Sequence, residues 1–371
     1  MEVSKGDGLM KWKTPAAAVL LLTFGALTLR YSQQAAQAVR DGLLLCGNVI
    51  LPALFPFLIL SSLVVELGLA DSLGTLARHW MKPVFGVGGA GASALALGLV
   101  GGYPVGAKTV CQLYNRGQCS RQEAQRLLAF CCNCGPGFIL GVAGGGIFDS
   151  RAVGLALWAV HTGAALLVGL LFRSYSYHVK EYTLSPVSRP GCAAPPSCPA
   201  AFLHAVTGSL QACLNISSFV LCFSVLNRLL TLSGLLPSQG WPGTVLAGIL
   251  ELSTGVAGLK EVSPLPRLCL AAFFLGWGGC SVHCQTLVFL SECGLSPGTY
   301  LAGKLLHGLL SALLILPFGR VLTLPAFLPQ SPCLPGFVQV LSRSATASLA
   351  LWLLGCLAMV RFLKNYAGKT S

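Results

Sequence analysis

Charged residues are scarce in this sequence. Asp, Glu, Lys and Arg make up only 9% of its 371 residues, whereas soluble domains carry roughly 25%. A chain so poor in charge cannot cover a surface that faces water. Because 54% of the residues are hydrophobic and the mean hydropathy is +0.74, we predict a multi-pass integral membrane protein in a lipid bilayer.

The sequence also lacks the patterns that would support an enzyme or an ATP-driven pump. Ser281 and His283 stand too close in sequence to act alone as nucleophile and base, and no GxSxG surrounds them. No phosphate-binding loop of the Walker type occurs. We therefore expect no enzymatic activity and no cofactor.

Metal ligands at zinc spacing are missing despite 16 cysteines. The run CCNC at 131–134 and the pair Cys280 and Cys284 have no second CxxC or HxxxH partner. Most other cysteines lie in apolar runs, where free cysteine behaves as a small hydrophobe. We interpret them as packing residues and expect no metal site.

A net charge of +13 is present, but it does not predict a nucleic-acid partner. The basic residues are scattered between apolar runs, without a basic face or interleaved aromatic residues. Scattered Lys and Arg in such a chain set membrane topology against anionic lipid. A pathway for an anionic solute is a second interpretation of the same charge.

Long apolar segments divide the chain. About ten of them reach the roughly 20 residues that a membrane-spanning helix needs. The segments lie at 15–30, 43–69, 85–113, 127–148, 152–172, 205–235, 242–259, 266–290, 301–323 and 345–363. The sequence therefore predicts an all-α membrane protein.

Five parts follow from this division. Residues 1–40 form a basic and then apolar stretch that resembles a secretory signal; we favour a retained signal-anchor helix because another long apolar segment follows. The other parts are a first repeat at 41–172, a polar Pro/Ser-rich linker at 173–204, a second repeat at 205–323, and a C-terminal loop with a final transmembrane helix at 324–371.

The two large parts are related in sequence. Residues 97–128 align with residues 275–306 with two one-residue slips, and the alignment matches paired glycines and several apolar residues. Matches in register at equivalent positions of two halves indicate an internal repeat. An inverted arrangement of such repeats is common in secondary transporters.

Each repeat interrupts an apolar segment with glycines, and the first also carries Pro104 and Lys108. A broken helix frees backbone groups that only protein or a water-lined cavity can satisfy, and the N-terminus of a half-helix attracts anions. Matched breaks of this kind point to a binding site. The alternative is that the glycines only let helices pack closely.

The two breaks differ in chemistry, since the first offers the Lys108 cation and the second neutral donors and acceptors. A further break, Gly-Pro-Gly at 135–137, follows Asn133. The candidate substrate-binding residues are Gly101, Gly102, Tyr103, Pro104, Val105, Gly106, Lys108, Asn133, Gly278, Gly279, Ser281, His283 and Gln285.

Glu251 stands out among the 11 carboxylates because it lies within an apolar segment, just before Ser253 and Thr254. An ionisable group inside a membrane segment is a candidate functional site. We expect Glu251, Ser253 and Thr254 to bind a coupling ion or the substrate. The alternative is that Glu251 reaches an interface or caps a helix break.

The motifs LGLVGGYPVGAK at 97–108 and GQCSRQEAQRLLAFCCNCGPGFILGVAGGGIF at 117–148 resemble the YlbJ-type sporulation integral membrane proteins. Further motifs follow in the family's order: LPALFPFLILSSLV at 51–64, ILELSTG at 249–255 and GGCSVHCQ at 278–285. The resemblance covers residues 40–320. This family belongs to a larger group with nucleoside-recognition gate domains, akin to concentrative nucleoside transporters.

The resemblance implies a role in endospore formation, in the bacterial cell membrane or the outer forespore membrane of a spore-former. It implies transport of dipicolinic acid toward the forespore, and this planar dianion suits Lys108 and two sets of helix N-termini. The cysteines of CCNC at 131–134 and Cys280 with Cys284 depart from the family, where we expect Asn, Ser or Ala.

We therefore expect a secondary transporter that carries a small organic anion by alternating access. Two other functions stay open: a transporter of nucleosides or other neutral solutes, and a non-transporting receptor or scaffold for spore assembly. The sequence identifies no protein partner and leaves a homo-oligomer open.

Overall fold

The computed structural model describes residues 7–67, 75, 79–174, 198–237 and 240–318. All described residues belong to one compact unit, Met1–Thr323. The expected final helix at 345–363 and most of the expected linker at 173–204 lie outside the described residues, and the expected domain boundaries stay predictions.

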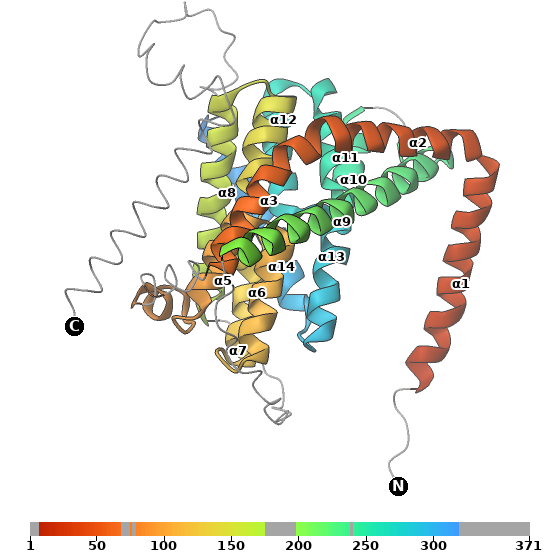
Figure 1. Ribbon diagram of the computed structural model, residues 1–371. Helices are drawn as coiled ribbons and strands as arrows, with labels where there is room; N and C mark the ends of the chain where they lie inside the picture. The colour runs from red at the N-terminus through yellow and green to blue at the C-terminus, as the bar shows by residue number, and fades with distance from the viewer. Residues whose placement is uncertain (1–6, 68–74, 76–78, 175–197, 238–239, 319–371) are drawn as a thin grey trace, which may run out of the picture. The chain divides into compact units, whose positions relative to one another are not determined.

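All regular structure in the described residues is helical (Figure 1). The α-helices are α1 Asp7–Arg30, α2 Ser32–Leu45, α3 Leu51–Glu66, α5 Gly91–Gly101, α6 Tyr103–Asn115, α7 Arg121–Cys131, α8 Arg151–Leu171, α9 Cys198–Leu232, α10 Gly240–Leu250, α11 Leu252–Gly258, α12 Pro264–Trp277, α13 Gly279–Glu292 and α14 Pro297–Leu314. The π- and 3-10 turns are η1 Cys46–Ile50, η2 Met81–Phe85, η3 Gly137–Ile147, η4 Phe172–Ser174 and η5 Leu259–Glu261.

Four helical stretches are long and apolar enough to cross a membrane: Arg151–Leu171, Cys198–Leu232, Pro264–Glu292 and Pro297–Phe318. A fifth results if Ser32–Ile50 and Leu54–Leu60, which meet at 56°, are counted as one bent span. The all-α membrane class is therefore confirmed. Several of the other expected segments consist of shorter helices, because glycines and polar residues interrupt them.

Two pairs of short helices fold back on themselves as hairpins. A Cβ built on Gly98 of α5 would lie 3.4 Å from the Cα of Gly106 in α6, although eight residues of a straight helix span about 12 Å. The turn is at Gly102, which has φ +91°. In the same way, a Cβ on Gly255 of α11 would overlap the backbone of Gly248 in α10.

Two other helices are interrupted. After α7, residues 132–135 leave the helix, and the chain becomes helical again before η3. Between α12 and α13 the break is at Gly278, with φ +93°, and Gly279 follows with φ +83°. Both glycine breaks predicted from the sequence are present, but Gly102 is a hairpin turn whereas Gly278 interrupts one candidate span.

Serines explain where three helices begin. The hydroxyl of Ser120 accepts a hydrogen bond from the backbone N–H of Glu123, whose carboxylate accepts from Ser120 in return, so a capping box opens α7. Ser150 caps α8, and Ser296 caps α14.

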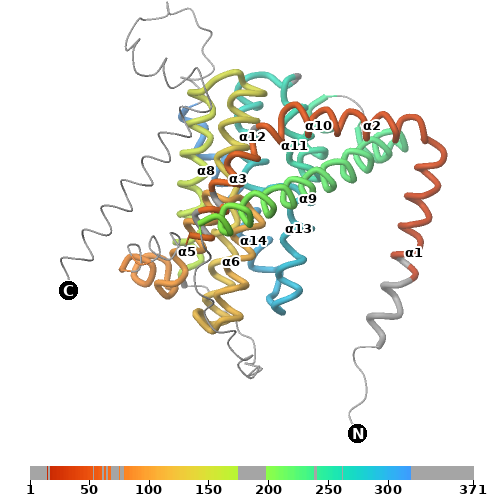
Figure 2. The backbone as a smooth tube through the Cα atoms, viewed as in Figure 1, coloured from red at the N-terminus to blue at the C-terminus, as the bar shows by residue number. Residues whose placement is uncertain are grey.

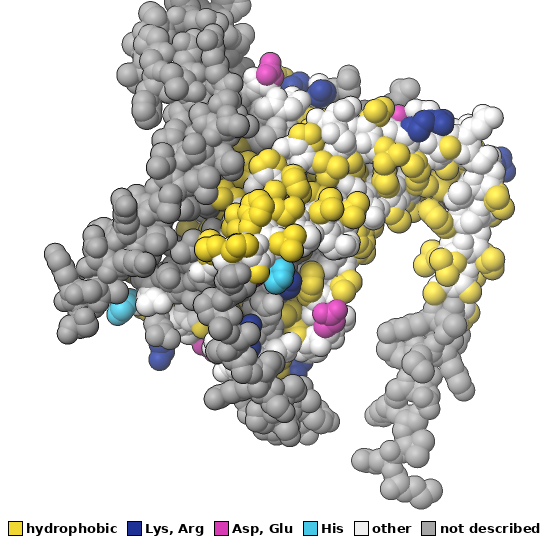
Figure 3. All heavy atoms as spheres, in the orientation of Figure 1, with side chains coloured by type: hydrophobic (Ala, Val, Ile, Leu, Met, Phe, Trp, Pro, Cys, Tyr) yellow, Lys and Arg dark blue, Asp and Glu magenta, His cyan; other side chains and the backbone are white. Residues whose placement is uncertain are grey.

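Helix packing places α14 against α7, α8 and α12, and places α9 along α2 and α3 (Figures 1 and 2). Apolar side chains cover much of the face in Figure 3, over α3 and α9. Phe202, Leu203, Leu210 and Leu214 of α9 are among the exposed apolar residues. Such an apolar surface is suited to lipid rather than water.

Candidate functional site

A cavity of about 600 Å³ lies where the hairpins, the interrupted helices, α3 and α9 meet. The turn of the α5–α6 hairpin and the turn of the α10–α11 hairpin both reach it. Residues of the α7–η3 break and the first turns of α13 complete the wall. The volume lies within the range of small-molecule sites, roughly 300–1,000 Å³.

Ten of the residues predicted as site residues line this cavity. They are Gly101, Gly102, Tyr103, Pro104, Val105, Lys108, Glu251, Ser253, Ser281 and Gln285. The fold thus brings together segments from residues 101 to 285. Six other predicted residues are not among the lining residues: Gly106, Asn133, Thr254, Gly278, Gly279 and His283.

Lys108 supplies a cation on the cavity wall. It lies in the second turn of α6, its side chain is exposed, and it has no hydrogen-bond or ion-pair partner among the described residues. The N-terminal residues of α6, from Tyr103 to Val105, line the same cavity. The partial positive charge of a helix N-terminus therefore adds to the charge of Lys108.

Glu251 forms the turn of the α10–α11 hairpin, and its side chain caps α11. The carboxylate accepts the backbone N–H groups of Ser253 at 2.9 Å and Thr254 at 2.6 Å. The Glu251 side chain is only 2% exposed. This geometry corresponds to the alternative considered from the sequence, in which Glu251 caps a helix break. The carboxylate also stabilises the positive N-terminal end of the α11 dipole.

Two predicted residues turn away from the cavity into the core. The Asn133 amide donates to the carbonyl of Phe130 at 2.8 Å and so caps the end of α7. The Nδ1 atom of His283 lies 2.9 Å from the Tyr300 hydroxyl, and its ring packs edge-on against Trp277. Gly106 cannot carry a side chain, because a Cβ there would overlap the Cys131 carbonyl.

The opposite wall contains polar residues that the sequence analysis did not select. His204, Gln211 and Asn215 of α9 line the cavity, and Gln211 donates to Asn215 at 3.0 Å. Their spacing of seven and four residues places them on one face of a helix. That spacing is the signal that could have identified them in an otherwise apolar segment.

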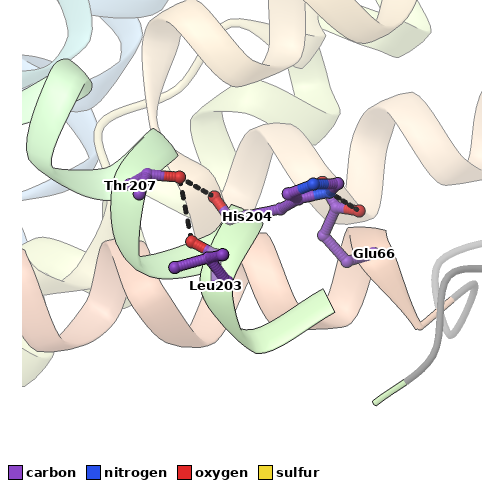
Figure 4. Close-up of polar contacts among 4 residues, drawn as sticks. All are labelled: Glu66, Leu203, His204 and Thr207. Carbon is purple, nitrogen blue, oxygen red and sulfur yellow. Dashed lines mark hydrogen bonds and ion pairs between the residues drawn. The ribbon is translucent and has the colours of Figure 1, made fainter. Parts of the chain in front are cut away.

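An ion pair stands beside this wall where α3 and α9 meet. The Nδ1 atom of His204 lies 3.7 Å from a carboxylate oxygen of Glu66, and both residues line the cavity (Figure 4). The His204 backbone carbonyl accepts from the Thr207 hydroxyl in the next turn of α9. The His204 side chain is 60% exposed, so the pair contributes little stability.

Among the described residues, no three His, Cys, Asp or Glu side chains gather closely enough to hold a metal ion. The arrangement instead offers the Lys108 cation, the N-terminus of α6 and several amides around one cavity. Such a set of groups is suited to bind a small solute that carries carboxylate or carbonyl oxygens.

Comparison with known proteins gives a full-length relative. The chain is similar to the sporulation integral membrane protein YlbJ of Bacillus subtilis (strain 168), with 31% identity over 342 residues that cover 83% of each protein. No family model matches the chain, and no solved structure matches it. The similarity and the helical spans agree on a multi-pass integral membrane protein.

Proposed function

This chain belongs to the family of the sporulation integral membrane protein YlbJ, and from that premise we propose that it is a secondary transporter of a small organic anion. The proposed substrate is dipicolinic acid, carried into the developing forespore across the outer forespore membrane. The coarser statement, a sporulation-related integral membrane protein, follows from the family itself.

Lys108 in the cavity is the observation that carries the proposal. Its cation has no ion-pair partner among the described residues, so it is available to a solute carboxylate. The N-terminal residues of α6 and Gln285 of α13 line the same cavity. A planar dicarboxylate can accept from these groups at both ends, and charge-assisted hydrogen bonds are the strongest that such a site offers.

The order of elements supports a two-repeat transporter. A hairpin, an interrupted helix and a long helix occur first as α5–α6, α7–η3 and α8, and again as α10–α11, α12–α13 and α14. In this register the turn at Gly102 corresponds to the turn at Glu251. The sequence alignment instead places Gly102 opposite Gly279, at the break between α12 and α13.

Alternating access follows from such a design. Discontinuous helices at the interface of two repeats hold the substrate, and movement of one repeat against the other exposes the site to each side in turn. Both hairpin turns and residues beside both interrupted helices line the cavity. We propose that these four elements move relative to each other while the substrate stays bound.

A nucleoside or another neutral solute is the second candidate. The amides of Gln112, Gln211, Asn215 and Gln285 all line the cavity and would hydrogen-bond an uncharged polar molecule. For such a solute, loss of the Lys108 charge would matter little. A receptor or scaffold for spore assembly would bind a solute without moving it.

Uptake by the purified full-length protein in liposomes tests the proposal. We expect uptake of labelled dipicolinate, and at least a tenfold weaker apparent affinity in Lys108→Gln because one charged hydrogen bond is lost. Lys260→Gln is the matched control, since Lys260 is exposed and does not line the cavity. Uptake of uridine without dipicolinate would favour the neutral solute, and binding without uptake would favour the receptor.

A further inference from the structure

A lysine is completely buried behind the cavity. Lys304 of α14 is 0% exposed. In the part of the chain that the structure describes, no carboxylate forms an ion pair with it. A buried ammonium without a counter-ion is costly unless other groups stabilise it. The groups around Lys304 therefore show how its charge is held.

Two acceptors and an aromatic ring surround the Lys304 ammonium. Its Nζ atom donates to the carbonyl of Cys132 at 2.7 Å and lies 3.0 Å from the Nδ1 atom of His307. The ring of Tyr103 is centred 5.0 Å away, within the range of a cation–π contact. Cys132 directly follows α7, so the ammonium is placed at the negative end of that helix.

The hydrogen bonds of the two neighbouring histidines indicate a tautomer for each. The Nε2 atom of His307 lies 2.9 Å from the carbonyl oxygen of His161; since a carbonyl only accepts, Nε2 carries the proton and Nδ1 accepts from Lys304. His161 in turn accepts the backbone N–H of Cys134 at its Nε2 atom, at 3.0 Å. Its own proton is therefore on Nδ1, an atom that has no hydrogen-bond partner among the described residues.

One layer of residues separates this charge from the cavity. Tyr103 contacts the Lys304 ammonium with its ring and also lines the cavity, and Cys134 lines the cavity two residues after Cys132. The Tyr103 hydroxyl donates to the Leu275 carbonyl of α12, which holds the ring in place. An anion in the cavity therefore acts on Lys304 across a medium of low dielectric, where attraction is strong.

We propose that Lys304 is the proton-coupling group of this transporter. With the cavity empty, burial without a counter-ion favours the neutral amine of Lys304; an anion in the cavity favours the ammonium, so the Nζ lone pair gains a proton from solvent as the anion binds. The same proton returns to water when the anion leaves. This inference rests on the proposed function, and it makes the transporter carry a proton together with its anion.

Other titratable groups face Lys304 from the surrounding helices, and none of those in the described residues is a carboxylate. They are His307 and Tyr300 of α14, His161 of α8, Cys132 and Cys134 after α7, Tyr103 of α6 and His283 of α13. On the elements packed against α14, the charged side chains bond elsewhere or are exposed. Arg121 bonds to Gly294, Glu123 to Ser120 and Gly88, Arg126 to Gly86, and Arg267 to Val262, whereas Arg151 at the start of α8 and Glu292 at the end of α13 are exposed.

Calorimetry of dipicolinate binding tests the inference. The full-length protein is titrated between pH 6 and pH 9 in buffers of different ionisation enthalpy, a range where the substrate carboxyls stay ionised. We expect uptake of about one proton per anion, and an apparent Kd that rises up to about tenfold per pH unit once Lys304 is neutral.

Two variants locate the proton. Lys304→Gln keeps an N–H donor for the Cys132 carbonyl but cannot gain charge, and Lys304→Arg stays charged at every pH used. Both should bind with no proton uptake, and either one suffices if the other does not fold. Lys260→Gln should behave as the unaltered protein. The Lys304 variants still contain His204, so loss of proton uptake in them excludes that histidine as its source.

The outcomes of these titrations distinguish the inference about Lys304 from the proposed function. Binding without proton uptake, or uptake that persists in the Lys304 variants, overturns the inference and leaves the proposed function standing. Absence of dipicolinate binding by the unaltered protein overturns the proposed function and the inference together.

Discussion

The sulfur atoms of Cys111 and Cys293 lie 2.7 Å apart, although the residues belong to different helices. Cys111 lies in α6, and Cys293 directly follows α13. Both thiols also contact the carbonyl of Phe289. This contact joins the helix that carries Lys108 to the helix that carries Gln285, so it reports on two walls of the cavity.

Mild oxidation should join these two cysteines. Each thiol loses a hydrogen to an added copper–phenanthroline and oxygen system, and a disulfide forms. We expect mass spectrometry to find a peptide pair linked through Cys111 and Cys293. Uptake should fall to a small fraction and return with dithiothreitol, because α6 and α13 can no longer move apart. Cys111→Ala should be insensitive to the oxidant; linkage of Cys111 to another cysteine would contradict this packing.

Substitutions of Glu251 separate capping from charge. Glu251→Gln keeps an acceptor for the N–H groups of Ser253 and Thr254, so we expect a loss of about 1 kcal/mol in the free energy of unfolding and near-normal uptake. Glu251→Ala leaves both buried N–H groups unpaired and should cost about 2 kcal/mol or more. Thermal unfolding in detergent and uptake in liposomes measure the two effects. Lost uptake in a Gln variant of normal stability would make the charge itself functional.

Two glycines of the α5–α6 hairpin should tolerate no side chain. A Cβ at Gly98 or at Gly106 would overlap the Cys131 carbonyl oxygen, and backbone atoms cannot move aside cheaply. We expect Gly98→Ala and Gly106→Ala each to destabilise the protein by about 3 kcal/mol or to prevent folding. Gly163→Ala is the control.

That control has a clear expectation of its own. Gly163 lies within α8, and nothing lies within 4 Å of an added Cβ. Alanine there should stabilise the helix by a few tenths of a kcal/mol to about 1 kcal/mol. Fluorescence-detected size-exclusion and melting in detergent compare the three variants. Equal stability of all three would mean that α5 and α6 do not approach each other as described.

The membrane class, the helical breaks and most of the cavity's α5–α6 wall could be predicted from the sequence. Low charge identifies the membrane, and paired glycines mark the interruptions at Gly102 and Gly278 because few other residues adopt positive φ. The Gly-Pro-Gly run at 135–137 marks the third interruption, which follows α7. These signals depend only on residues close together in the sequence, so they can be recognised without knowledge of the fold.

The rest depends on contacts between distant segments. The turn at Glu251 has a carboxylate where the first hairpin has a glycine, so no breaker marks it as a hairpin. The wall formed by α9 has only a weak signal in the sequence, because amides at 211 and 215 in an apolar helix also suit interhelical hydrogen bonds. Lys304 matched Arg126 in the repeat, and only the fold shows that it is buried beside His307.

The capping box of α7 should make stability depend on pH. Burial raises the pKa of the Glu123 carboxyl, but hydrogen bonds from Ser120 and Gly88 and the charge of Arg126 outweigh it, and the net pKa is below its ordinary value. A group with a lowered pKa stabilises the fold above its unfolded value, about 4.3, and loses this contribution as pH falls through its folded value.

We therefore compare melting of the unaltered protein and Glu123→Gln in detergent between pH 3 and pH 7. At pH 7 the variant should be less stable by up to about 1 kcal/mol, a modest value because Glu123 is partly exposed to solvent. Below pH 4 the difference should shrink, since the protonated acid then resembles the amide. Gln122→Ala, on an exposed position of the same turn, should show no such trend. A difference that stays constant with pH would assign the effect to packing rather than to the charge of Glu123.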